Sequence, residues 1–198
     1  GDPLPLQIGP VGGGGTEVKV GQIPHHRAVH LLREGRVFVI GPQSGLHMAH
    51  ADLAVKCIEA GKPVFCEKPL ATTLEDAKKV VEAEKASGKR LLQIGFMRRF
   101  DPDYIKMKKI LDSGELGAPL MAHCISRTPR IAAGFTNAMQ VTNVLIHEID
   151  QFRWLFDEEL VRGQMLAARN TAFAADGLND PQLALMWTES NILIDVEC

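Results

Sequence analysis

An adjacent carboxylate and amine, Glu67 and Lys68, follow a short apolar run at residues 63–66 and are followed directly by Pro69. Ligands of a doubly wound parallel sheet bind outside the carboxyl ends of its strands, which is where such a pair would lie. An ammonium group held there by a carboxylate can donate a hydrogen bond to a substrate hydroxyl. A solvated ion pair at the end of a strand is the alternative, and the spacing alone does not separate the two.

A second set of polar side chains, Asn143, His147 and Asp150, is spaced by four and three residues. This spacing places all three on one face of a helix that we predict near residues 144–156. A histidine beside a carboxylate accepts a proton near neutral pH, which makes His147 a candidate general base. A structural histidine hydrogen-bonded to Asp150 is the alternative that this pattern leaves open.

The stretch from Gly95 to Asp101 joins a predicted strand to a predicted helix and contains two adjacent arginines, Arg98 and Arg99. Arg98 is placed to meet a polyol or a phosphate. The alternative is a linker in which the two arginines pair with Asp101 and Asp103.

Four consecutive glycines at residues 12–15 are the candidate for a dinucleotide-binding loop. The fingerprint of that loop is Gly-x-Gly-x-x-Gly. Gly12 and Gly14 fit its first two positions, but Glu17 stands at the third, and the register that starts one residue later also fails. A flexible loop is therefore as good an interpretation as a pyrophosphate-binding one.

Short apolar runs alternate with helical patterns in the first half of the chain. Strands are predicted at 37–40, 64–66 and 91–94, with one helix ending at 59 or 60 and another running from a capping box at 72–75 to residue 87. The second helix would turn Leu74, Ala77, Val80 and Val81 toward the sheet. This order predicts a parallel sheet with crossover helices. Before residue 37 the pattern predicts strands at 6–9 and 16–23 and a helix at 25–34.

The second half of the chain has a different character. A helix is predicted from 101 to 114, and then strands at 120–125, 161–168, 182–188 and 192–197, with a loop at 126–142 and a helix at 144–156. The last two strands would form a hairpin. The predicted fold class is α/β: a partial Rossmann-like parallel sheet in a domain at 1–95, followed at 96–198 by an α+β domain with a mostly antiparallel sheet.

Composition narrows the class of function. The chain has 198 residues and a formal net charge of −2, so no strong positive field attracts nucleic acid or an anionic membrane. No run of 18 apolar residues is present to span a membrane. The four cysteines stand apart, which favours reduced thiols in a cytoplasmic protein over a metal site or a disulfide framework. No metal is expected.

Five stretches of the chain together resemble the Gfo/Idh/MocA family of NAD(P)-dependent sugar oxidoreductases. They occur in the family's order at 60–77 (AGKPVFCEKPLATTLEDA), 91–104, 117–129, 141–155 (VTNVLIHEIDQFRWL) and 177–197. Within the family the likeness is greatest to enzymes that oxidise inositol. The resemblance implies a nucleotide-binding domain followed by a large, mostly antiparallel sheet. It also implies a polyol substrate, NAD as the cofactor with NADP left open, and a homotetramer paired through that sheet.

Carried over by position, the resemblance implies a role for each candidate residue. Lys68 is the catalytic lysine, His147 removes the hydroxyl proton, and Asn143 belongs to the same catalytic group. The residues implied to contact the substrate are Met97, Arg98 and Asp150. Those implied to lie near the cofactor are Gly12, Gly14, Ser44, Leu46, His50, Glu67 and Lys68.

The chain departs from the family pattern at three points. Asn143 stands where the family has aspartate, and an amide cannot supply the charge that stabilises Lys68 and a protonated His147. Ser126 stands where inositol dehydrogenases tend to have histidine, which leaves the polyol open. The 36 residues before Val37 are too few for the usual first half of a nucleotide-binding domain, so we expect a shortened member of the family.

Two alternatives stay open beside polyol oxidation with hydride transfer to nicotinamide. One is a catalytically impaired remnant that keeps the sheet domain for self-association, which Asn143 and the incomplete glycine loop favour. The other is a dehydrogenase of another sugar.

Overall fold

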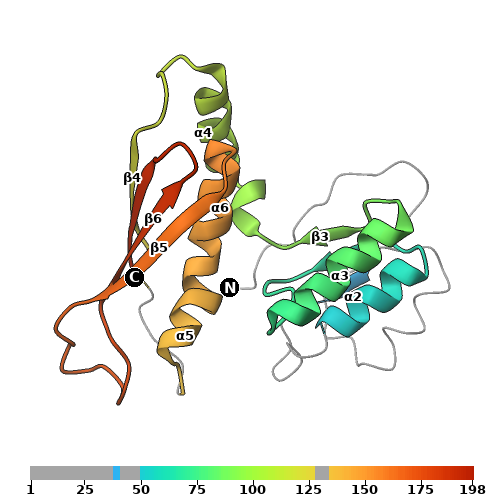
Figure 1. Cartoon of the computed structure of the whole chain (residues 1–198), viewed down its shortest axis with the longest axis horizontal. Coiled ribbons are helices and arrows are strands. Elements are labelled where there is room, and N and C mark those ends of the chain that lie inside the picture. The colour runs from blue at the N-terminus through green and yellow to red at the C-terminus, as the bar shows by residue number, and fades with distance from the viewer. Residues whose placement is uncertain (1–37, 41–49, 128–133) are drawn as a thin grey trace, which may run out of the picture. The chain divides into compact units, whose positions relative to one another are not determined.

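A computed structural model describes residues 38–40, 50–127 and 134–198 of the chain (Figure 1). These residues belong to two compact units that divide between Gly95 and Phe96, each with its own hydrophobic core. The elements predicted before residue 37 lie outside the described residues. So do the candidate cofactor residues Gly12, Gly14, Ser44 and Leu46.

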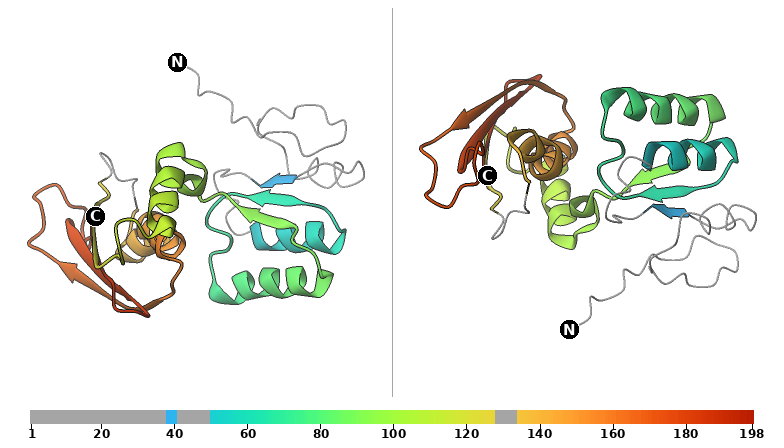
Figure 2. Two further views of the ribbon diagram at one scale, coloured as in Figure 1. Left: turned by 90° about the horizontal axis from the view of Figure 1, so that it is seen from above. Right: turned by 90° about the horizontal axis from the view of Figure 1, so that it is seen from below.

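The first unit contains a three-stranded parallel sheet in the order β1-β2-β3. The strands β1 (Phe38–Ile40), β2 (Val64–Cys66) and β3 (Leu92–Ile94) alternate with the helices α2 (His50–Glu59) and α3 (Leu74–Ser87). Both helices lie on the same face of the sheet (Figure 2). The predicted parallel sheet with crossover helices is confirmed.

The helix α3 meets the core over a short part of its length. Val80 is fully buried, whereas Leu74 is 73% exposed and Val81 is 43% exposed, so the prediction that these two face the sheet is wrong. For Leu74 in the first turn the reason is length, because a helix of 14 residues is about 21 Å long and a three-residue strand only about 10 Å. Val81 is exposed because it lies about 100° around the helix from the buried Val80. The predicted cap also shifts by one residue, since the Thr73 hydroxyl oxygen accepts from the Asp76 N–H at 3.1 Å.

The second unit contains a four-stranded sheet in the order β4-β7-β6-β5. Its strands are β4 (Met121–Ile125), β5 (Leu160–Ala167), β6 (Gln182–Thr188) and β7 (Leu193–Glu197). β4 pairs parallel with β7, and the other two neighbouring pairs are antiparallel, as expected of a mostly antiparallel sheet. The β6–β7 hairpin turns through Asn191, whose φ of 72° is in the left-handed region that asparagine tolerates.

Helices cover one face of this sheet (Figure 1). They are the short helix η2 (Met97–Phe100), α4 (Pro102–Ser113), α5 (Asn137–Met139), the π-helical segment η3 (Gln140–Leu145) and α6 (Ile146–Phe156). Alternate residues of the two central strands, among them Met186 and Ile194, are buried against Leu145, Phe152 and Leu155. Among the described residues, no helix combines the length and apolar character needed to cross a bilayer.

The predicted loop at 126–142 is wrong in its last part, because helical structure begins at Asn137. The hydroxyl oxygen of Thr136 caps this start by accepting from the Met139 N–H at 3.3 Å. The Ile146 N–H then donates to the Val141 carbonyl five residues back, which is a π-helical bond. The run Val141, Thr142, Asn143 and Val144 has low helix propensity, so local sequence did not reveal the helix.

Candidate active site

The loop that carries Lys68 leaves the first sheet at its carboxyl edge. The strand register aligns Ile40, Cys66 and Ile94, the last residues of the three strands. The Glu67 N–H donates to the Ile40 carbonyl at 2.8 Å, and the Gly95 N–H donates to the Cys66 carbonyl at 2.8 Å. These bonds fix the first residue beyond each of the two strands.

Glu67 lies against the backbone of Gly95. A Cβ atom added at Gly95 would stand 3.1 Å from the Glu67 Cδ and from both of its carboxylate oxygens. A glycine here therefore leaves the space that this carboxylate occupies. Sequence analysis missed this role, although a glycine directly after a strand is a known sign of close approach.

His50 connects the start of α2 to the same loop. Its side chain is buried, and its Nδ1 lies 2.9 Å from the Pro69 carbonyl oxygen. Lys68, one residue earlier, is half-buried. His50 was predicted to lie near the cofactor. In the structure it is buried and contacts the backbone of the loop that carries Lys68.

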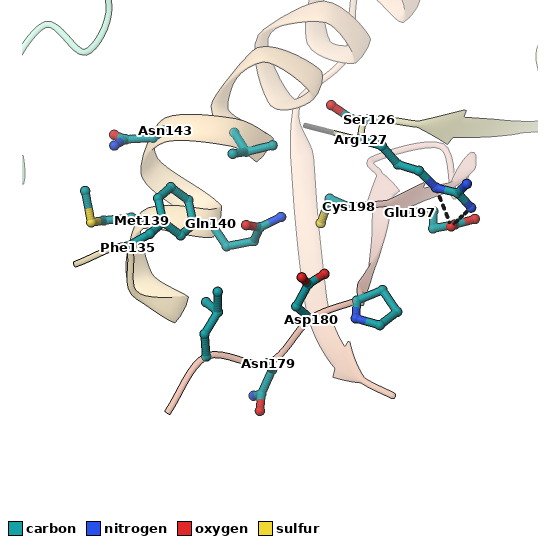
Figure 3. Close-up of a pocket in the computed structure, with 13 residues that line it drawn as sticks. Ser126, Arg127, Phe135, Met139, Gln140, Asn143, Asn179, Asp180, Glu197 and Cys198 are labelled. Atoms are coloured by element: carbon teal, nitrogen blue, oxygen red, sulfur yellow. Dashed lines mark hydrogen bonds and ion pairs between the residues drawn. The ribbon is translucent and has the colours of Figure 1, made fainter. Parts of the chain in front are cut away.

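A cavity of about 470 Å³ lies within the second unit, between η3, the end of β7 and the loop before β6 (Figure 3). Asn143 and Ser126, both singled out from the sequence, line it. In Figure 3, Gln140, Asp180 and Cys198 point toward one another, whereas the amide of Asn143 points to the opposite side. The full lining is Ser126, Arg127, Phe135, Met139, Gln140, Asn143, Val144, Leu178, Asn179, Asp180, Pro181, Glu197 and Cys198.

The other site residues predicted in the second unit do not line this cavity. Met97 is exposed and His147 is half-buried. Asp150 is buried, and its two carboxylate oxygens accept from Nε and Nη2 of Arg99, both at 2.8 Å.

The two arginines of η2 do not take the partners that the linker interpretation gave them. Arg98 donates to Gln151 at 2.7 Å, and its Nη2 lies 2.6 Å from an oxygen of Glu148. Asp101 instead caps α4, where it accepts from the Asp103 N–H at 2.8 Å. Pairing of the arginines with Asp101 and Asp103 is therefore wrong. The partners on α6 are some 50 residues away in sequence, and spacing carries no signal for them.

Lys68 and His147 belong to different units, so their convergence on one substrate stays a prediction. Asn143 and His147 share the second unit, but the π-helical turn between them changes the register that a regular helix would give.

The four cysteines are free thiols. Burial raises the pKa of the Cys57 thiol to about 11 and that of Cys66 to about 12, with the nearby Glu67 charge adding to the second shift. Such thiols are poor nucleophiles and metal ligands near neutral pH. Over the described residues, no group of three or more His, Cys, Asp or Glu side chains is arranged to hold a metal ion.

Two family models match the chain. Residues 29–96 match the oxidoreductase family with an NAD-binding Rossmann fold, and residues 104–198 match the GFO/IDH/MocA C-terminal domain. The chain belongs to the Gfo/Idh/MocA oxidoreductase family. This confirms the resemblance found in the sequence, and it confirms NAD as the cofactor at the level of the family.

Relatives within the family include several inositol dehydrogenases. Inositol 2-dehydrogenase 3 of Saccharopolyspora erythraea is 51% identical over 148 residues, which are 75% of this chain and 44% of that protein. Inositol 2-dehydrogenase of Serratia proteamaculans is 48% identical over 149 residues, again 75% of this chain and 44% of that protein.

A solved structure shares the fold. Myo-inositol dehydrogenase from Lactobacillus casei, in complex with NAD(H) and myo-inositol, matches with a TM-score of 0.79 and 37% identity. The match covers 86% of this chain and 50% of that one. The chain therefore spans about half the length of the relatives that it matches.

Proposed function

We propose that this chain carries the catalytic residues of an NAD-dependent dehydrogenase that oxidises a ring secondary alcohol of an inositol-type polyol to a ketone. The observation that carries the proposal is the position of Lys68. It follows the central strand of a parallel Rossmann sheet at the carboxyl edge, where such sheets bind their ligands, in a chain 51% identical to an inositol 2-dehydrogenase. NAD, when bound, accepts the hydride.

His147 takes the proton of the hydroxyl group that is oxidised. An imidazole suits this step, because histidine is the side chain that ordinarily takes up and releases a proton near neutral pH. Lys68 donates a hydrogen bond to the same hydroxyl oxygen and stabilises the negative charge that develops there. Asn143 supports this pair with an amide hydrogen bond, without the charge of a carboxylate.

The binding roles follow from exposure and contacts. Met97 is exposed on η2 and free to contact the substrate ring. Arg98 and Asp150 have their charged groups occupied on and around α6, so we assign substrate contact to Met97 alone of these three. Glu67 and Lys68, at the carboxyl edge, are the described residues best placed to meet the nicotinamide cofactor, and Gly12, Gly14, Ser44 and Leu46 keep their expected cofactor roles as proposals.

Self-association through the second sheet is part of this proposal. The face of that sheet turned away from α6, which we call the outer face, carries Met121 at 64% and Ile125 at 56% exposure. The cross-strand neighbours of these two residues on β7 and β6 are Leu193 and Trp187 in one row and Glu197 and Leu183 in the other. Exposed apolar side chains gathered on one face of a sheet favour burial against another sheet. The four free thiols favour a reducing compartment, the cytoplasm.

The experiment that tests the proposal follows NADH formation with myo-inositol, scyllo-inositol and a panel of aldoses, with NAD and with NADP. Wild type should reduce NAD with an inositol, and Lys68→Ala and His147→Asn should each reduce kcat by a factor on the order of 10² to 10⁴. Turnover with aldoses and none with inositols would favour the dehydrogenase of another sugar, which Ser126 in the cavity wall keeps open.

The non-catalytic remnant is favoured by Asn143 and makes a different prediction. A remnant would self-associate without binding the cofactor. Titration of NADH by its fluorescence separates the two, because an active enzyme should bind NADH and a remnant should show no binding even at millimolar cofactor.

A further inference from the structure

The short helix η2 is attached to α6 by two adjacent arginines. Arg98 uses both terminal nitrogens, Nη1 to Gln151 at 2.7 Å and Nη2 to Glu148 at 2.6 Å. Arg99 binds both oxygens of Asp150 at 2.8 Å in a two-pronged contact. The three acceptors on α6, the carboxylates of Glu148 and Asp150 and the amide of Gln151, are all buried.

Aromatic rings hold the same two guanidinium groups from other sides. The Arg98 Cζ lies 5.9 Å from the centre of the Tyr104 ring on α4, and the Arg99 Cζ lies 5.9 Å from the centre of the Trp154 ring on α6. Both distances are within the range of a cation–π contact. Each guanidinium group is thus held both by side chains of α6 that accept its hydrogen bonds and by an aromatic ring.

The acceptors on α6 are placed on both sides of His147. With about 100° between successive helical residues, Asp150 lies about 60° to one side of His147, and Gln151 and Glu148 lie about 40° and 100° to the other. Two arginines that bind this set therefore fix the rotation of α6 about its axis at the turn that presents His147.

Stability alone does not explain the Glu148 side chain. It is 0% exposed, its Oε2 has no hydrogen-bond partner among the described residues, and its charge is set against Arg98. A buried ion pair of this kind is often no more stabilising than well-packed apolar side chains, whereas it does fix geometry. A carboxylate at this position is better explained by a positioning role, because its ion pair with Arg98 holds α6 in a fixed orientation against η2.

We propose that Arg98, with Glu148, is a positioning residue that sets the orientation of His147, and that Arg98 is not a ligand of the substrate. Arg99 and Asp150 make a second contact of the same kind on the other side. This proposal rests on the role assigned to His147 in the proposed function, and it adds residues that act through it.

A double-mutant cycle tests the proposal. Arg98→Met removes the guanidinium, and Glu148→Gln removes the charge while keeping the shape. Each single variant should lower kcat by a factor on the order of 10 to 10², because a small displacement of a reacting group has effects of that size. KM for the polyol should stay within about twofold, since uniform substrate binding is not touched. The double variant should be no worse than the poorer single one, because both remove the same contact.

The chain offers a matched control on the same helix. Arg153 of α6 binds Glu159 through Nε at 2.8 Å, and both side chains are exposed. Arg153→Met and Glu159→Gln remove an Arg–Glu pair of the same type without touching the turn of His147, so kcat should be that of wild type. Thermal melts of all variants identify any that fail to fold.

A second readout does not depend on activity. The imidazole nitrogens of His147, assigned by comparison with His147→Asn in ¹⁵N NMR, should shift and broaden in Arg98→Met and in Glu148→Gln, and should not change in Arg153→Met. An unchanged His147 signal in the first two variants would overturn the proposal. So would a large rise in KM for Arg98→Met together with normal kinetics of Glu148→Gln, which would make Arg98 a substrate ligand. A wild-type protein without activity would instead count against the proposed function. The NMR result would then decide the positioning role of Arg98.

Discussion

Among single residues, Asn143 is the one whose type limits the proposed reaction. Its amide can accept or donate a hydrogen bond but brings no charge to the imidazolium that forms on His147. We predict that Asn143→Asp raises kcat about tenfold, because a carboxylate stabilises the protonated base and the Lys68 ammonium. The measurement is the initial rate of NADH formation at saturating polyol.

Asn179 provides the control for this substitution. It lines the same cavity from the loop before β6, so Asn179→Asp adds the same charge at a different wall. If charge near the cavity were enough, both variants would gain rate. A gain in Asn143→Asp alone supports a specific role, and no gain in either removes Asn143 from the catalytic group.

Gly95 is a residue whose missing side chain matters. In Gly95→Ala the new Cβ would stand 3.1 Å from the Glu67 carboxylate, which must move by a few tenths of an ångström. Because the end of a glutamate side chain moves at low cost, we predict a nearly unchanged melting temperature. The affinity for NADH should fall by about fivefold, because a small shift of a group at the strand end weakens its contacts. Fluorescence titration measures this change.

Gly163→Ala is the matched control for Gly95→Ala. A Cβ at Gly163 on β5 would meet its nearest neighbour, the Leu185 carbonyl oxygen, at 3.9 Å, which is ordinary contact. NADH affinity in this variant should equal that of wild type. Equal losses in both variants would show that a general effect on folding, and not Glu67, is responsible.

Residue types and short spacings predicted the position of Lys68 and the caps of α3 and α4 to within a residue. They failed for Arg98 and Arg99, whose partners lie about 50 residues away on α6. An arginine close to an aspartate in sequence suggests an ion pair, but the Asp101 carboxylate caps α4 instead. Local spacing cannot report a contact that only the packing of η2 on α6 creates.

At the scale of elements, the N-terminus of α3 depends on one hydroxyl group. The Thr73 oxygen accepts from the Asp76 N–H at 3.1 Å, and its hydroxyl donates to the Asp76 carboxylate at 2.7 Å. We predict that Thr73→Ala lowers the free energy of unfolding by about 1 kcal/mol, the usual loss for such a cap. Thr72→Ala, one residue earlier, should change it little. Urea unfolding followed by circular dichroism measures both.

The same cap predicts a pH dependence. The hydrogen bond from Thr73, and then Lys79, lowers the pKa of Asp76 below its usual 3.8. A carboxyl group with a lowered pKa stabilises the fold above its unfolded-state pKa, and the contribution is lost as the pH falls. The difference in free energy of unfolding between wild type and Thr73→Ala should therefore become smaller below pH 3.8. A constant gap down to pH 2, measured in urea at each pH, would contradict this role of the charge.

The core between α2 and β2 predicts a loss of stability in alkali. The pKa of Cys57 is raised to about 11 and that of Cys66 to about 12, whereas an exposed thiol titrates near 9. Neutral thiols therefore favour the folded state fully below pH 9, and the contribution is lost as the pH rises toward 11 and 12. The free energy of unfolding should fall by on the order of 1 kcal/mol per pH unit for each thiol. Cys57→Ala should remove the contribution of one thiol to this fall per pH unit. An unchanged dependence on pH would contradict the burial of the Cys57 thiol.

Element prediction worked best where a strand alternates with a helix. The three parallel strands and their helices follow from apolar runs separated by glycine and proline, because each strand is short and each helix has a clear end. The start of the helical stretch at Asn137 was missed because its π-helical turn contains residues that favour strands and turns. Leu145, the last residue of that turn, packs against the sheet, and the periodicity of the sequence does not report such a contact.

At the scale of the whole molecule, the self-association that we propose uses the outer face of the second sheet. Along β4 and the two residues after it, the exposed Met121 and Ile125 alternate with side chains that bind β7, His123 to Asp195 and Arg127 to Glu197. Apolar and aromatic side chains mixed with polar ones occur in interfaces between subunits. We predict that Ile125→Lys turns the oligomer into smaller species, because a buried ammonium group without a partner is costly.

Light scattering after size-exclusion chromatography measures the mass of each variant. Leu74→Lys is the control, since Leu74 is 73% exposed on α3 of the first unit and its replacement should leave the mass unchanged. A wild-type monomer would refute self-association outright, while an unchanged oligomer in Ile125→Lys would move the interface away from the outer face. Activity of the dissociated variant, compared at equal chain concentration, would then show whether each chain binds its substrate alone, because a site completed by a partner loses turnover as the oligomer dissociates.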